Sequence, residues 1–107
     1  MIISRTPYRI SLFGGGTDLP QYYKKHGGKV LGFAINQFSY LFLKETNEML
    51  GYKYRIVYSK HEILNSIKKI IHPSVRETLK YYKFNKSVEI THNGDLPALS
   101  GMGSSSS

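Results

Sequence analysis

Residues 9–20 read Arg9-Ile10-Ser11-Leu12-Phe13-Gly14-Gly15-Gly16-Thr17-Asp18-Leu19-Pro20. The apolar side chains before the glycines alternate, since Tyr8, Ile10 and Leu12 share one face of an extended chain. That period of two predicts a strand over residues 7–13. Three consecutive glycines then end the strand, because they permit a sharp turn that other residues adopt only with strain.

A helix is expected directly after the glycines. Asp18 suits its N-cap, Pro20 its first turn and Gln21 the closing position of a capping box. Gly27 and Gly28 are expected to stop it. One interpretation of Asp18 is therefore purely structural, as the cap of this helix in a β-turn. The alternative is that it lines a ligand pocket, and both can hold at once.

The remaining chain continues the mixture of strands and helices. Residues 29–44 predict one long strand or two with a bend near Gly32, and they are expected to form a β-hairpin with residues 53–58 across a turn at 47–51. An apolar stripe predicts a helix ending at His72-Pro73; its members are Ile63, Leu64, Ile67, Ile70 and Ile71. Ser74 and Glu77 fit a capping box for a second helix, with Val75, Leu79 and Tyr82 facing inward. A strand over 87–92 and a turn at Asn93-Gly94 complete an α+β fold with a mixed or antiparallel sheet.

Composition limits the class of protein. The chain has 107 residues, no cysteine and a formal net charge of +8, which fits one small domain without disulfides or thiolate metal sites. No apolar run approaches the roughly 20 residues that span a bilayer, and we expect a cytoplasmic protein without a signal peptide. The basic excess falls late in the chain and attracts anions such as phosphorylated metabolites or nucleic acid, unless it is only a solvated helix face. Its members are Lys68, Lys69, Arg76, Lys80, Lys83 and Lys86.

The first glycine segment has the chemistry of an acceptor site. Gly14, Gly15 and Gly16 let the backbone approach a ligand closely. Thr17 and Asp18 then supply a hydroxyl and a carboxylate, which accept hydrogen bonds from a polyol. Arg9 lies on the same strand face as Ser11 and could offer a fixed positive charge to a phosphoryl group.

A second glycine segment fills residues 95–107. Backbone N–H groups at the start of a helix bind phosphate, and serine hydroxyls can add hydrogen bonds or a ligand to Mg²⁺. The segment lacks the Gly-Lys-Ser/Thr ending of a Walker A loop and the glycine spacing of a Rossmann fold. A flexible Gly/Ser linker is the alternative. The interleaved apolar residues argue against it; these are Leu96, Pro97, Leu99 and Met102.

Together the two segments resemble the GHMP kinase superfamily, named for galactokinase, homoserine kinase, mevalonate kinase and phosphomevalonate kinase. The pattern from Arg9 to Tyr23, continued by Gly27, Gly28 and residues 30–35, is similar to the branch that contains D-glycero-D-manno-heptose 7-phosphate kinase. Residues 97–106 are similar to the superfamily's Pro-x-x-x-Gly-Leu-Gly-Ser-Ser loop, with Met102 in the leucine place. Gly15 and Gly16 stand where galactokinases have Glu and His, which disfavours galactose as the substrate.

That resemblance implies a fold and a set of roles. The fold would be the ribosomal-protein-S5-like N-terminal part of a GHMP kinase, binding ATP and Mg²⁺ in a cleft. Arg9 would lie near the reacting hydroxyl, and residues 14–18 would contact the sugar. The ATP phosphates would be bound by Ser100, Gly101, Met102, Gly103, Ser104, Ser105 and Ser106, with Ser104 or Ser105 also binding Mg²⁺.

The resemblance also implies a function, namely transfer of phosphate from ATP to a sugar or sugar phosphate. Heptose 7-phosphate would be the acceptor, at its anomeric hydroxyl. The partners would be that sugar phosphate and ATP, without nucleic acid or membrane, and a homodimer is compatible with the sequence.

Two alternatives stay open. The family's catalytic aspartate and third glycine motif would lie beyond residue 107, so residues 1–107 are expected to be an N-terminal fragment that is inactive alone. A basic nucleic-acid-binding module of S5-like fold is the other alternative, and steep salt dependence of binding would mark it.

Overall fold

A computed structural model describes residues 1–97, and its two compact units are considered separately. The ribbon unit comprises Thr6–Ser39 and the segment that begins at Asp95. The sheet unit comprises Met1–Arg5 and Tyr40–Gly94. The observed helices and mixed sheet confirm the expected α+β class.

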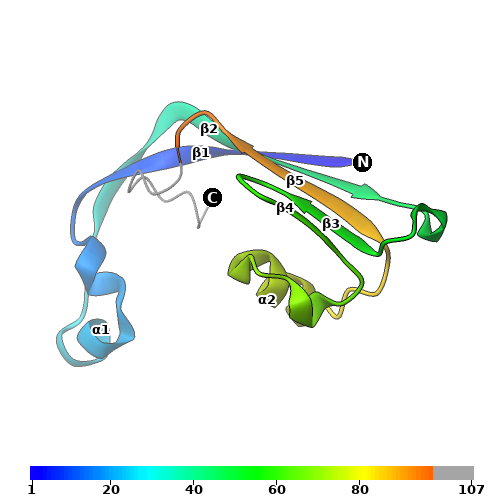
Figure 1. Ribbon diagram of the computed structural model, residues 1–107. Coiled ribbons are helices and arrows are strands. Elements are labelled where there is room, and N and C mark those ends of the chain that lie inside the picture. Colours follow the sequence, from blue (N-terminus) through cyan, green and yellow to red (C-terminus); the bar gives the residue numbers. More distant parts are fainter. Residues whose placement is uncertain (98–107) are drawn as a thin grey trace. The chain divides into compact units, whose positions relative to one another are not determined.

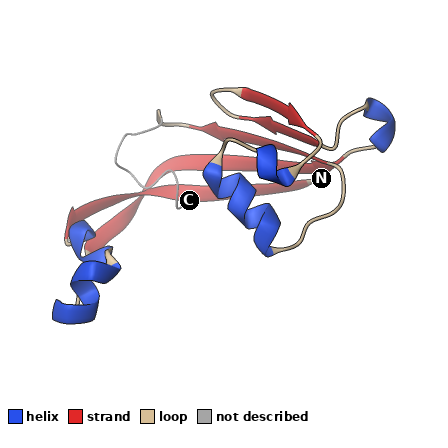
Figure 2. Cartoon of the chain, turned by 60° about the horizontal axis from the view of Figure 1, so that its bottom comes forward, coloured by secondary structure: helices blue, strands red, loops and turns tan. Residues whose placement is uncertain are grey.

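The ribbon unit is built from parts of two long strands, β1 (Ile2–Phe13) and β2 (Leu31–Glu45). They lie side by side, and a short 3-10 helix, η1 (Gly15–Asp18), and a helix, α1 (Pro20–His26), connect them (Figure 2). The strand expected at residues 7–13 is thus confirmed, although it begins earlier, at Ile2. Within its alternating pattern Tyr8 is buried, whereas Leu12 remains more than half exposed.

Helix α1 ends where the sequence predicts and begins differently. Gly27 is its C-cap, with a φ of 70°, and its N–H donates to the carbonyl of Tyr23 at 2.9 Å. The N-cap position, however, belongs to Leu19, and no side chain caps it. The prediction that Asp18 caps this helix is therefore wrong, because Asp18 is already taken up by the last turn of η1.

The sheet unit orders its strands β1-β2-β5-β3-β4, with β3 at Tyr54–Val57, β4 at His61–Leu64 and β5 at Val88–Gly94. Strand β3 pairs antiparallel with β4 and parallel with β5, so the sheet is mixed. A parallel pair needs a crossover connection, and helix α2 (Pro73–Tyr81) lies in it. In the sheet unit α2 lies along one face of β3 and β4 (Figure 1).

The core of the sheet unit lies between those strands and α2. Its buried members are Tyr54, Ile56, Ile70, Leu79, Val88 and Ile90. Alternate residues of the two parallel strands are thus buried together, namely Tyr54 and Ile56 of β3 and Val88 and Ile90 of β5. Arg55 and Glu89 are paired in the parallel register between them, and their side chains form an ion pair at 2.9 Å.

Two predictions about how the strands are connected are wrong, each for its own reason. The hairpin expected between residues 29–44 and 53–58 does not form, because β5 inserts between β2 and β3. Residues 47–51 instead hold a 3-10 turn, η2 (Glu48–Leu50). Asn93 and Gly94 are the last residues of β5 rather than a turn, since the strand continues further than its apolar pattern.

The helix expected from the stripe at residues 63–71 is absent. Residues 61–64 pair with β3, and Ile67–Lys69 form only a 3-10 turn, η3. Glu62 explains this outcome, because its buried carboxylate accepts hydrogen bonds from the N–H groups of Ile71 and His72. A continuous helix would use those N–H groups in its own ladder.

The start and inner face of α2 also differ from expectation. His72 is the N-cap, and its Nδ1 accepts from the N–H of Val75 at 3.5 Å, so Ser74 and Glu77 form no capping box. Leu79 is buried as expected and Val75 packs against the core, but Tyr82 is 72% exposed. Tyr82 lies just past the helix end, at its C-cap, where the helical period no longer places it inward.

Candidate functional site

The glycine turn after β1 crosses closely over the chain that follows α1. Gly14 has a φ of 87°, and a Cβ there would lie 1.9 Å from the carbonyl oxygen of Lys29. A Cβ on Gly28 would lie 3.0 Å from Oγ1 of Thr17. The crossing therefore leaves no room for a side chain at Gly14 and little room at Gly28.

Thr17 ties this crossing together with its side chain. Its Oγ1 lies 2.7 Å from the carbonyl oxygen of Gly14 and 3.2 Å from that of Lys29. A threonine hydroxyl has a single hydrogen, which these two carbonyls share. The hydroxyl hydrogen of Thr17 is therefore already used in hydrogen bonds to the backbone. Towards a ligand, Thr17 can act only as an acceptor, through its oxygen lone pairs.

An open hollow of about 400 Å³ lies beside this crossing. Its lining residues are Thr17, Asp18, Tyr23, Gly27, Gly28, Lys29 and Val30. Among residues 1–97, no hydrogen bond or ion pair engages the carboxylate of Asp18, which is exposed. Since Asp18 does not cap α1 either, its carboxylate is available to accept hydrogen bonds from a ligand in this hollow.

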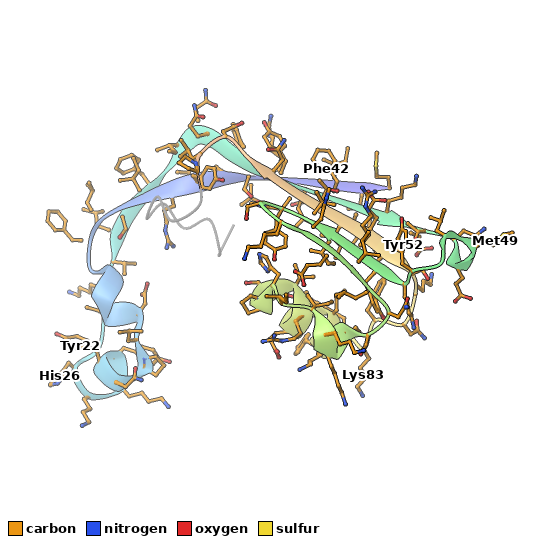
Figure 3. The ribbon with its side chains drawn as sticks, viewed as in Figure 1. Tyr22, His26, Phe42, Met49, Tyr52 and Lys83 are labelled. Atoms are coloured by element: carbon orange, nitrogen blue, oxygen red, sulfur yellow. The ribbon has the colours of Figure 1, made fainter. Side chains whose placement is uncertain are left out.

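Helix α1 forms one wall of the same region. The rings of Tyr22 and His26 lie one turn apart, with centroids separated by 5.1 Å (Figure 3). Tyr23, the next residue after Tyr22, lines the hollow. The helix is only seven residues long, and Gly27 turns the chain back past Thr17.

Arg9 does not line the hollow. Its Cδ lies 3.5 Å from the position that a Cβ on Gly32 would take, so the arginine stem crosses β2 at a glycine. Ser11, on the same strand face, has its Oγ 3.7 Å from the corresponding Cβ position of Gly15. Of the predicted acceptor residues, the structure brings Thr17 and Asp18 together in one hollow and leaves Arg9, Gly14, Gly15 and Gly16 outside its lining.

The second glycine segment starts from a fixed point in the ribbon unit. The N–H of Phe38 donates to Oδ2 of Asp95 at 2.8 Å, and the N–H of Asp95 donates to the carbonyl of Phe38 at 3.0 Å. Asp95 thus anchors the entry of this segment to β2. The predicted ATP and Mg²⁺ residues, Ser100 to Ser106, lie outside the described residues.

Sequence reasoning missed the contribution of Lys29 to the hollow. Gly27 and Gly28 predicted the end of α1 but not that the following residues return to Thr17. The available signal was the second glycine pair itself, since two glycines at a helix end also permit a close crossing of chains. The anchoring role of Asp95 carried no local signal, because its partner Phe38 is 57 residues away.

The late basic residues belong to the sheet unit and are partly neutralised. Glu77 lies 3.1 Å from Nε of Arg76 and 3.5 Å from Nζ of Lys80, and Lys86 pairs with Glu45 at 3.0 Å. The hydrogen bond from Arg76, together with Lys80, holds the pKa of the Glu77 carboxyl below its usual value. Exposed pairs of this kind are typical of a solvated surface.

A second cluster of titratable groups surrounds Glu62 in the sheet unit. Its carboxylate accepts from the hydroxyl of Tyr58 at 2.9 Å and from the N–H groups of Ile71 and His72. Burial by itself would raise the pKa of Glu62, but these hydrogen bonds and the nearby His72 hold it below its usual value. Burial, and then the Glu62 carboxylate, raise the pKa of the Tyr58 hydroxyl.

Residues 1–97 lack two kinds of feature, a cluster of metal ligands and a membrane-spanning helix. No group of three or more His, Asp or Glu side chains gathers there as a metal site. No helix in that range is long and apolar enough to cross a membrane.

Comparison with solved structures finds similar folds. A D-glycero-D-manno-heptose 1-phosphate kinase from Bacteriodes thetaiotaomicron is 28% identical, with a TM-score of 0.75, over 96% of this chain and 37% of that one. A mevalonate kinase is 23% identical, with a TM-score of 0.69, over 98% of this chain and 36% of that one, which shows the fold alone. The chain thus spans little more than a third of either protein. No protein-family model matches the chain, and no curated protein matches it.

Proposed function

We infer that this chain, which has the fold of the N-terminal part of a GHMP kinase, contributes the acceptor side of an ATP-dependent sugar or sugar-phosphate kinase. The observation that carries the proposal is the Asp18 carboxylate, which lines an open hollow and is committed to no helix cap or ion pair among residues 1–97. A carboxylate in that condition accepts hydrogen bonds from the hydroxyls of a polyol.

The reaction would join the acceptor to the γ-phosphoryl group of ATP. The oxygen of a sugar hydroxyl attacks the γ-phosphorus, the bond from that phosphorus to the bridging oxygen breaks, and ADP leaves. The hydroxyl proton passes to a base, which the family resemblance places beyond residue 107. In such a reaction the protein acts mainly by positioning the reactants and stabilising charge.

Residues of this chain would supply the positioning. Asp18 would hold the acceptor by accepting from its hydroxyls, and Thr17 would keep the turn in place and offer lone pairs only. The positively charged guanidinium of Arg9 would stabilise the negative charge that develops on the transferring phosphoryl group. Gly14 and Gly28 would serve by letting the two segments cross.

The nucleotide would be held by Ser100, Gly101, Met102, Gly103, Ser104, Ser105 and Ser106. Glycine N–H groups and serine hydroxyls fit a triphosphate, and Mg²⁺ needs only one or two protein ligands beside phosphate oxygens and water. Ser104 or Ser105 would be that ligand, and the ion would neutralise phosphate charge. The pair formed by Phe38 and Asp95 fits this assignment, because it anchors the entry of the segment in the same unit as Asp18.

The proposed acceptor is a heptose phosphate, specifically D-glycero-D-manno-heptose 7-phosphate at its anomeric hydroxyl. The similar Bacteriodes thetaiotaomicron protein is named for heptose 1-phosphate. The proposed acceptor differs from that name in the carbon that carries its phosphate, which is carbon 7. A cytoplasmic location would give the enzyme access to ATP and to phosphorylated sugars.

The test is a screen of the full-length protein for ADP release. The acceptors are heptose 7-phosphate, heptose 1-phosphate, unphosphorylated heptose, fucose, galactose and mevalonate. We expect turnover with a heptose and little with galactose or mevalonate. Release of ADP with none of the sugars, under conditions where the protein binds ATP, would contradict the proposal.

A variant separates the acceptor role of Asp18 from general damage. Asp18→Ala should raise the KM for the sugar by about tenfold or more, because it removes a charged hydrogen-bond acceptor, and leave the KM for ATP nearly unchanged. Asp18→Asn keeps one acceptor oxygen and should fall between the two. An equal rise of both KM values would assign Asp18 to the fold rather than to the acceptor.

A further inference from the structure

Two residues of opposite charge that are not paired with each other are among those that line the hollow beside the glycine crossing. Asp18 and Lys29 both line it, and among residues 1–97 no ion pair includes either side chain. The part of the ribbon unit from Thr6 to Ser39 has one acidic residue, Asp18, against four basic ones. The basic residues are Arg9, Lys24, Lys25 and Lys29. Only Lys29 among the four lines the hollow.

The backbone of Lys29 is held in place by the crossing. Its carbonyl oxygen lies 3.2 Å from Oγ1 of Thr17, and Gly14 passes so close that it admits no side chain. Gly28, immediately before Lys29, is packed against Thr17 in the same way. The start of the lysine side chain is therefore fixed relative to Asp18, while its four-carbon stem allows the ammonium to adjust to a ligand.

This pair of charges selects a ligand with two kinds of group. A carboxylate attracts hydroxyl hydrogens and repels phosphate, whereas an ammonium attracts phosphate as a compact point charge. A neutral sugar would leave Lys29 without a partner, and an anion without hydroxyls would leave Asp18 unused and repelled. A sugar that carries an anionic ester away from the hydroxyls held by Asp18 satisfies both.

We propose that Lys29 binds the phosphate ester of the acceptor sugar, opposite the hydroxyls that Asp18 holds. This assignment rests on the proposed kinase function for its substrate class, and it adds the residue that distinguishes a sugar phosphate from the free sugar. Lys29 is a specificity-determining residue here and takes no part in the transfer of the phosphoryl group. A competing role, contact with the phosphates of ATP, is an outcome that the test separates.

The experiment compares Lys29→Met with Lys25→Met in the full-length protein. Both variants remove one ammonium and keep an unbranched apolar stem, but Lys25 lies on α1 outside the lining of the hollow. KM is measured for ATP, for heptose 7-phosphate and for the same heptose without phosphate. Lys29→Met should raise the KM for heptose 7-phosphate by about tenfold, because a charge-assisted contact to phosphate is lost. Its KM values for free heptose and ATP should stay within about twofold of the wild type, which is well below that tenfold step.

Lys25→Met should leave all three constants unchanged, and Lys29→Arg should restore most of the affinity for heptose 7-phosphate. Equal rises for both sugars would overturn the assignment, and so would a rise confined to ATP. An unchanged KM for heptose 7-phosphate would overturn it as well.

Calorimetric titration with heptose 7-phosphate, without ATP, keeps the two proposals apart. Binding that Lys29→Met weakens while no sugar is turned over would support the phosphate contact and contradict the kinase function. Turnover of heptose 7-phosphate that is indifferent to Lys29→Met would leave the kinase function standing and remove the contact. Absence of binding together with absence of turnover would overturn both.

Discussion

Phe38 and Asp95 exchange two hydrogen bonds across 57 residues of sequence. The N–H of Phe38 donates to the Asp95 carboxylate at 2.8 Å, and the N–H of Asp95 donates to the Phe38 carbonyl at 3.0 Å. The second glycine segment begins at Asp95, and the first one lies in the same ribbon unit. One carboxylate therefore anchors the start of the proposed phosphate-binding segment, which follows β5 in the chain, to Phe38 of β2.

Removal of that carboxylate is expected to affect ATP more than sugar. Asp95→Ala should lower the free energy of unfolding by about 1–3 kcal/mol, since the N–H of Phe38 loses a charged acceptor. In the proposed kinase the KM for ATP should rise while the KM for the sugar changes little. Chemical denaturation and steady-state kinetics measure the two effects. Glu48→Ala is the control, because Glu48 is an exposed acid of η2, and it should stay within about 0.5 kcal/mol.

Thr17 is expected to stabilise the glycine turn through the hydrogen bonds that its hydroxyl donates to the backbone. Thr17→Val keeps the shape but loses the hydrogen bonds to Gly14 and Lys29, which should cost about 1 kcal/mol of stability and weaken sugar binding. Thr17→Ser retains the hydroxyl and should be close to the wild type in both respects. Thermal unfolding and the KM for the sugar test the pair. Wild-type values for Thr17→Val would show that the hydroxyl does not hold the crossing.

Gly14 should tolerate no side chain. Gly14→Ala places a Cβ against the carbonyl of Lys29 and forces a φ of 87° on alanine, so the loss of stability should exceed about 1 kcal/mol. Gly16→Ala is the matched control in the same turn, because nothing lies within 4 Å of a Cβ there. It should change the free energy of unfolding by less than about 0.5 kcal/mol. Equal costs for the two variants in urea denaturation would contradict this account of the crossing.

The Glu62 cluster predicts a loss of stability in acid. Since the pKa of Glu62 in the folded chain is below its usual value, the unfolded state takes up protons first as the pH falls. The contribution of Glu62 is therefore complete above the unfolded pKa of about 4.3 and is lost as the pH falls through the lower folded value.

Glu62→Gln isolates that contribution. At neutral pH it should be less stable than the wild type by about 1–3 kcal/mol, because the N–H groups of Ile71 and His72 lose a charged acceptor. The difference between the two proteins should shrink as the pH falls below about 4. Urea denaturation at several pH values measures it, and a difference that is constant across this range would contradict the assignment.

The sequence by itself determined the elements whose signals are local. Alternation around Tyr8 and Ile10 identified a strand, Gly27 marked the end of α1, and a strand was predicted over residues 87–92, where β5 lies. Such patterns depend on backbone geometry within a few residues. The paired glycine motifs also carried the resemblance from which the kinase fold was expected.

Only the tertiary structure decided which of these elements meet. The strand β5 displaced the hairpin expected between β2 and β3, and the apolar stripe at 63–71 became a strand and a 3-10 turn because Glu62 bonds the backbone beyond it. Lys29 and Asp18 line the same hollow, and Asp95 accepts a hydrogen bond from the N–H of Phe38. Contacts between residues far apart in the chain leave no periodic trace in the sequence, since their free energy arises from pairing and burial that exist only in the folded chain.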